Sequence, residues 1–136
     1  MKFAYMPDTH FGVYNQPAPA PDQAADAFEQ LLDEARLAEE LGFDGVFLPE
    51  RHGRGETFIP SPLVAATAIA ARTTRITIAT TVLMPALYNP MHLAEQVAMI
   101  DNLSRGRPVR AGSRSRVSPG LPSNLRRSLG TARQAV

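Results

Sequence analysis

Residues 42–52 read GFDGVFLPERH, and this stretch decides the fold. Gly42 stands where a preceding helix should end, because glycine adopts the left-handed backbone that commonly follows a helix. Residues 46–48 form a short apolar run, which is typical of a strand covered on both faces. Pro49 has no amide hydrogen to donate to a sheet, so the strand should end there. The order of helix, glycine and buried strand predicts an α/β fold.

Three ionisable side chains, Glu50, Arg51 and His52, follow this strand. Parallel α/β folds bind ligands beyond the C-terminal ends of their strands, so these residues are candidates for catalysis. An imidazole can act as a general acid or base near neutral pH, whereas a guanidinium stays protonated and cannot act as a base. The alternative interpretation is a surface ion pair between Glu50 and Arg51 beside a loop histidine.

The rest of the chain alternates between the same two kinds of segment. Apolar residues recur at spacings of three and four within the predicted helices, and β-branched residues dominate the last predicted strand. We predict N-caps at Asp22, Ser61 and Asn89. The predicted elements are strands at residues 2–6, 46–48 and 75–83 and helices at residues 22–41, 62–72 and 90–103. This alternation predicts strands that are parallel and adjacent in chain order.

Composition excludes several classes of site. The 136 residues include no cysteine, which excludes disulfides, thiol catalysis and thiolate metal sites. No apolar run reaches the roughly 18 residues of a membrane span, and the N-terminus is too short for a secretory signal. No cluster of acids and histidines has metal-ligand spacing. We therefore expect a cytoplasmic protein with no metal and no membrane partner.

Charge divides the chain sharply in two. Residues 1–104 hold all 13 acidic residues and six of the 14 basic ones, whereas residues 105–136 hold eight arginines and no acid. The second segment is rich in Arg, Ser, Gly and Pro, so we predict no fourth strand after Gly106 and disorder over residues 108–136. Eight arginines attract phosphate groups, but the segment lacks aromatic residues, so we expect no nucleic-acid partner.

Taken in order, these motifs resemble the luciferase-like, flavin-dependent monooxygenases, a family of (β/α)8 barrels. The resemblance covers residues 1–107 and implies the first three βα units of a TIM barrel, followed by the tail at residues 108–136. The family continues beyond Arg107 with a glycine-containing strand, so the change at Pro108 suggests a reading-frame shift, a truncated gene or a divergent tail. The matching motifs are LGFD (41–44), ERH (50–52), PSP (60–62), ARTTRI (71–76), TTVLMP (80–85), NP (89–90), LAEQ (93–96) and IDNLSRGR (100–107).

The resemblance also implies a chemistry. Members use reduced flavin mononucleotide (FMN) and O2 to oxygenate an organic substrate; an alternative is a deazaflavin coenzyme that transfers hydride without O2. A third possibility is a non-catalytic module that docks on a full-length partner, in a homo- or heterodimer. Because the second half of the barrel is missing, we expect the isolated chain to bind flavin weakly or not at all and to show no turnover.

The family pattern assigns roles residue by residue. It places Glu50, Arg51 and His52 at the flavin ring, although luciferases carry their catalytic histidine where this chain has Arg51, which argues against light emission. Thr80 and Thr81 occupy the place where the family often has a non-proline cis peptide against the flavin; ordinary strand propensity also explains them. The two expected substrate contacts are His10, which could equally be an exposed loop histidine, and Tyr88.

Overall fold

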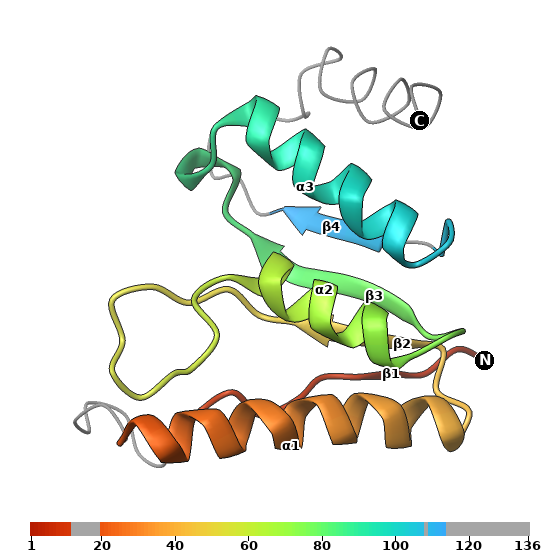
Figure 1. Ribbon diagram of the computed structural model, residues 1–136, viewed down its shortest axis with the longest axis horizontal. Coiled ribbons are helices and arrows are strands. Elements are labelled where there is room, and N and C mark those ends of the chain that lie inside the picture. Colours follow the sequence, from red (N-terminus) through yellow and green to blue (C-terminus); the bar gives the residue numbers. More distant parts are fainter. Residues whose placement is uncertain (12–19, 108, 114–136) are drawn as a thin grey trace.

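The computed structural model describes residues 1–11, 20–107 and 109–113 (Figure 1). Strands and helices alternate along them, as predicted. The elements are β1 (Ala4–Tyr5), α1 (Pro21–Glu40), β2 (Gly45–Leu48), α2 (Pro62–Arg72), β3 (Thr77–Leu83), the short 3-10 helix η1 (Pro85–Leu87), α3 (Pro90–Leu103) and β4 (Val109–Ser113). No helix in this described part of the chain is both long and apolar enough to cross a membrane.

The sheet holds four parallel strands in the order β1-β2-β3-β4. The register sets Val46 of β2 opposite Ile78 of β3, and Leu48 opposite Thr80. Parallel pairing of the first three strands in chain order is thus confirmed. Because all strands run the same way, their C-terminal ends meet along one edge of the sheet.

The prediction that no fourth strand follows α3 is wrong for residues 109–113. The sequence VRAGS lacks apolar alternation, yet β4 pairs with β3 in parallel register, with Gly112 opposite Thr81. A Cβ atom on Gly112 would lie 2.6 Å from the carbonyl oxygen of Thr80, so only glycine allows this close approach. Pairing with a buried neighbour therefore overrides weak strand propensity. The predicted disorder at residues 108 and 114–136 falls outside the described residues.

The helices pack with the sheet around one apolar core (Figure 1). Helix α1 contacts β2 and α2, α2 contacts β2 and β3, and α3 contacts β4 and α2. Strands β2 and β3 supply Val46, Leu48 and Ile78 to this core. The apolar stripe predicted for the first helix is confirmed at Leu31, Ala35 and Ala38, which are buried. Leu41, also predicted to lie on it, is 68% exposed, and Leu32, which was not predicted to lie on it, is buried.

The observed helix caps agree with the predicted caps in part. The first helix starts at Pro21 with Ala20 as its N-cap, two residues before the predicted cap at Asp22. Ser61 is the N-cap residue of α2, but its side chain makes no capping bond. Asn89 caps α3 as predicted, since its Oδ1 accepts the N–H groups of the second and third helical residues. Gly42 follows α1 with φ +86°, as the opening stretch predicted.

A carboxylate joins the end of α1 to the start of β3. Glu39 accepts the backbone N–H groups of Thr74 (3.0 Å), Arg75 and Ile76 (2.7 Å). Burial opposes ionisation of Glu39, but the N–H groups that point at it hold the pKa of its carboxyl below the ordinary value. The segment that leads into β3 is thereby fixed against a helix residue more than 30 positions earlier in the chain.

Arg107 performs a similar joining function after α3. Its guanidinium donates to Thr73 Oγ1 at 2.8 Å and to the carbonyl oxygen of Ala70 at 2.7 Å, both at the end of α2. Desolvation lowers the pKa of Arg107. The hydrogen bonds of Arg107 are half-buried.

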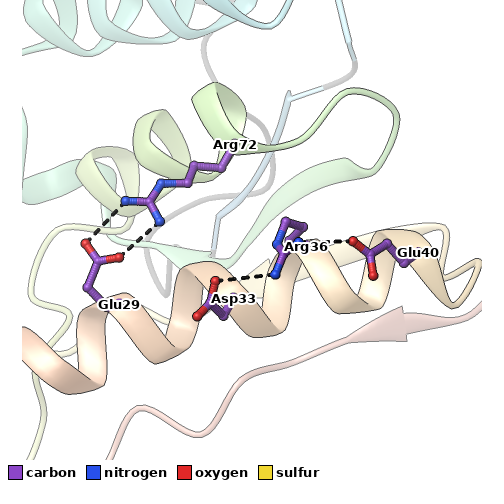
Figure 2. A network of polar contacts seen from close by, with 5 residues as sticks. All are labelled: Glu29, Asp33, Arg36, Glu40 and Arg72. Carbon is purple, nitrogen blue, oxygen red and sulfur yellow. Dashed lines mark hydrogen bonds and ion pairs between the residues drawn. The ribbon is translucent and has the colours of Figure 1, made fainter.

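Figure 2 shows a different kind of contact, the exposed ion pairs on the outside of α1 and α2. Among them, Arg72 makes two hydrogen bonds with the carboxylate of Glu29. Exposed pairs of that kind contribute only ~0–1 kcal/mol each.

Candidate functional site

The site is built around the buried carboxylate of Glu50. This side chain is 0% exposed and accepts three hydrogen bonds. Its Oε1 atom lies 2.8 Å from Nε2 of His52 and 2.9 Å from the hydroxyl of Tyr88. Its Oε2 atom accepts the backbone N–H of Met84 at 2.5 Å. Three of the predicted site residues, Glu50, His52 and Tyr88, are thus in direct contact.

Local sequence explains why they meet. Pro49 follows the last residue of β2, so Glu50 stands just past the C-terminal end of that strand. Met84 follows the last residue of the neighbouring β3, and η1 then turns the chain so that Tyr88 returns to the same place. The site therefore lies at the strand ends where parallel α/β folds bind ligands.

Tyr88 keeps its proton well above neutral pH. Burial, followed by the hydrogen bond to Glu50 and the charge of that carboxylate, raises the pKa of Tyr88 to about 12. A hydrogen bond with the Ser61 side chain acts in the opposite direction. The phenol is therefore a hydrogen-bond donor to Glu50 under physiological conditions. Ser61, predicted only as a helix cap, is part of the site's surroundings; no signal in the sequence distinguished that role from capping.

Arg51 and His52 are the more accessible members. The side chain of His52 is 40% exposed. Arg51 is half-buried, and its Nε atom is buried without a hydrogen-bond partner among the residues that the structure describes. An N–H group left in this way is costly unless an acceptor reaches it. Arg51 therefore offers a hydrogen-bond donor to an oxygen or nitrogen atom of a ligand.

Thr80 and Thr81 lie next to this cluster on β3. Thr80 is buried, and its hydroxyl donates to the carbonyl oxygen of Gly112 at 3.3 Å. Thr81 Oγ1 lies 3.8 Å from the sulfur of Met6, beyond the end of β1. The peptide bond between Thr81 and Val82 is cis. A non-proline cis peptide is thus present at the second of the two predicted threonines.

His10 contacts other residues than those of the Glu50 cluster. Its Nδ1 atom lies 2.8 Å from Asp8, and this hydrogen bond holds the pKa of the Asp8 carboxyl below its usual range. An isolated antiparallel bridge joins His10 to Thr57. His10 also lines a groove of about 450 Å3 beside α1, together with Tyr5 and other residues. Among the described residues, no group of three or more acids and histidines could hold a metal ion.

Comparisons with known proteins identify the family of this chain. Residues 1–109 match the family of luciferase-like monooxygenases. The chain is 32% identical over 100 residues to limonene 1,2-monooxygenase of Rhodococcus erythropolis, an alignment that covers 73% of this chain and 26% of that protein. It is 41% identical over 85 residues to the F420-dependent glucose-6-phosphate dehydrogenase of Amycolatopsis mediterranei, covering 58% of this chain and 25% of the relative.

A solved structure extends the comparison to the fold. The crystal structure of the monooxygenase RslO1 from Streptomyces bottropensis superposes with a TM-score of 0.69 at 31% sequence identity, covering 98% of this chain and 39% of that one. The chain thus spans about a quarter of the curated relatives' length and about two fifths of this solved structure. The match over residues 1–109 shows that this chain belongs to the luciferase-like monooxygenase family.

Proposed function

We propose that this chain supplies the N-terminal βα units of a TIM-barrel oxidoreductase that oxygenates a small organic substrate with reduced FMN and O2. The observation that carries this proposal is the cluster at the C-terminal ends of β2 and β3. There, the buried Glu50 contacts His52 and Tyr88. Similarity to limonene 1,2-monooxygenase supports the reaction class.

The residues present fit a flavin. Arg51 has a buried donor without a protein acceptor, and flavin rings and phosphates carry oxygen atoms that accept hydrogen bonds. In our proposal Arg51, Thr80 and Thr81 hold the cofactor. When bound, reduced flavin supplies the two electrons that the reaction of O2 with the substrate requires.

The chain's own side chains act around that cofactor. His52 is the residue that accepts or returns a proton, because it is the accessible imidazole of the cluster. Glu50 is enclosed and Tyr88 donates a hydrogen bond to it, and in our proposal both keep water from the reacting groups. His10 lies on the side of β1 and would contact a part of the substrate distant from the chemistry.

A deazaflavin-dependent dehydrogenase is the second candidate. The alignment at 41% identity with an F420-dependent dehydrogenase favours it. A deazaflavin, when bound, would accept hydride from an alcohol without O2, and His52 would take the proton of the substrate hydroxyl. Both candidates use the same strand ends, so one titration series compares them.

Amide NMR of the 15N-labelled 136-residue chain, titrated separately with FMN and with F420, tests the proposal. We expect weak binding in fast exchange that shifts the amides of residues 50–52 and 80–83. Arg51→Gln should weaken it several-fold, whereas Arg36→Gln on the outside of α1 should not. Stronger response to FMN favours the monooxygenase, and stronger response to F420 favours the dehydrogenase. Shifts that inorganic phosphate alone reproduces, or equal affinities of the two variants, would refute the site.

A further inference from the structure

We propose that Glu50 is a positioning residue that holds neutral His52 as the Nε2–H tautomer, so that Nδ1 is the ring atom offered to the ligand. The proposal rests on the proposed function only for the nature of that ligand. The hydrogen bonds that support it lie entirely within this chain.

The tautomer follows from the donors and acceptors present. An ionised carboxylate can only accept hydrogen bonds. Nε2 of His52 lies 2.8 Å from Glu50 Oε1, so in the neutral ring the hydrogen must be on Nε2. A neutral imidazole carries one hydrogen, and Nδ1 is then left with its lone pair.

Glu50 itself is held independently of His52. The backbone N–H of Met84 is fixed by the chain and cannot change from donor to acceptor. The hydroxyl of Tyr88 donates to the same oxygen as His52. With both oxygens engaged and the side chain fully buried, Glu50 has no free atom for a ligand. It therefore acts through His52, whose side chain is 40% exposed.

Replacing Glu50 by glutamine should reverse the tautomer of His52. The amide has one accepting oxygen and one donating nitrogen, whereas the site presents three donors. The Met84 N–H cannot adapt, so the amide oxygen should stay on Met84 and the amide NH2 should face His52 and Tyr88. Both of these groups can accept a hydrogen bond instead. His52 would then accept at Nε2 and carry its hydrogen on Nδ1.

Long-range 1H–15N NMR of the histidine rings at alkaline pH measures this directly in the ligand-free 136-residue chain, with His52 assigned by its loss in His52→Asn. We expect a pyrrole-like Nε2 and a pyridine-like Nδ1 in the wild type, and the reverse in Glu50→Gln. Asp8→Asn is the matched control: it removes the carboxylate beside His10 and should leave the His52 ring unchanged. Tyr88→Phe removes one donor and should preserve the wild-type tautomer.

Each outcome decides the proposal. A wild-type His52 with its hydrogen on Nδ1 would overturn it, as would a folded Glu50→Gln chain in which His52 keeps the wild-type tautomer. If Glu50→Gln fails to fold, the wild-type and Tyr88→Phe spectra still decide, because both must show hydrogen on Nε2. These readings need no cofactor, so the result of the flavin titration bears on the proposed function alone and leaves this inference standing or falling on the tautomers.

Discussion

Replacing Glu39 by alanine measures how much one carboxylate contributes to joining α1 to β3. The substitution removes the acceptor of three backbone N–H groups. Thr74 and Arg75 are exposed, so water can replace the acceptor there, but Ile76 is 1% exposed and its N–H would stay unsatisfied. A buried donor left without a partner costs ~1–3 kcal/mol, so we expect a loss of about 2 kcal/mol.

Urea denaturation followed by circular dichroism is the assay. At an m-value of ~1–2 kcal/mol/M, the midpoint should fall by ~1–2 M. Glu40→Ala is the matched control, because the neighbouring Glu40 forms an exposed pair with Arg36, 3.3 Å away. Pairs of that kind contribute ~0.3–0.5 kcal/mol. Equal losses for the two variants would refute the reasoning.

The same carboxylate predicts a pH dependence. The pKa of Glu39 is lower in the folded chain than its ordinary value of 4.5. Its contribution is therefore complete above the unfolded pKa and is lost as the pH falls through the folded pKa. The stability difference between wild type and Glu39→Gln should be constant from pH 7 down to about 5 and should shrink below that. A difference that grows on acidification would contradict the lowered pKa.

Four further outcomes follow from features of the fold and site. Arg107→Ala should lower the free energy of unfolding by about 1.5–3 kcal/mol in urea titrations, because it removes a charged donor from the half-buried Ala70 carbonyl and Thr73 hydroxyl; a loss below about 0.5 kcal/mol would contradict the joining role. Gly112→Ala should speed amide exchange across β4, since the added methyl group meets the backbone of β3; unchanged protection would refute the close approach. Asn89→Ala should cost about 1 kcal/mol through loss of the cap, again by urea titration. Glu50→Gln should lower the pKa of Tyr88 from about 12 toward 10, as read by phenolate absorbance; an unchanged value would show that burial alone raises it.

The order of strands and helices was predictable because it depends on local patterns. Apolar spacing, prolines and Gly42 located the first three βα units without knowledge of any long-range contact. The strand at residues 109–113 was not predictable in this way. Its residues carry little strand propensity of their own, and only the ladder with β3 makes them a strand.

In the candidate site, too, contacts between sequence neighbours were predictable and contacts between distant residues were not. Glu50 and His52 are two residues apart, so their contact was accessible from the sequence. Tyr88 joins them from 38 residues away through the turn of η1, which no local pattern specified. Glu39 is one of several acids on α1, and only the three-dimensional structure shows that it binds backbone N–H groups. The roles of Tyr88 and Glu39 depend on partners far away in the sequence, so no periodic pattern of residues indicates them.

The strand order has a consequence for how the chain is made. Each strand pairs with the strand that precedes it in the chain, and the helix between them packs beside that pair. Contacts therefore form between segments that leave the ribosome one after another. The sequence separations are short compared with those of a sheet whose first and last strands pair, which favours rapid folding. During synthesis, every new βα unit finds its docking surface already exposed, and no strand has to enter between two that have paired.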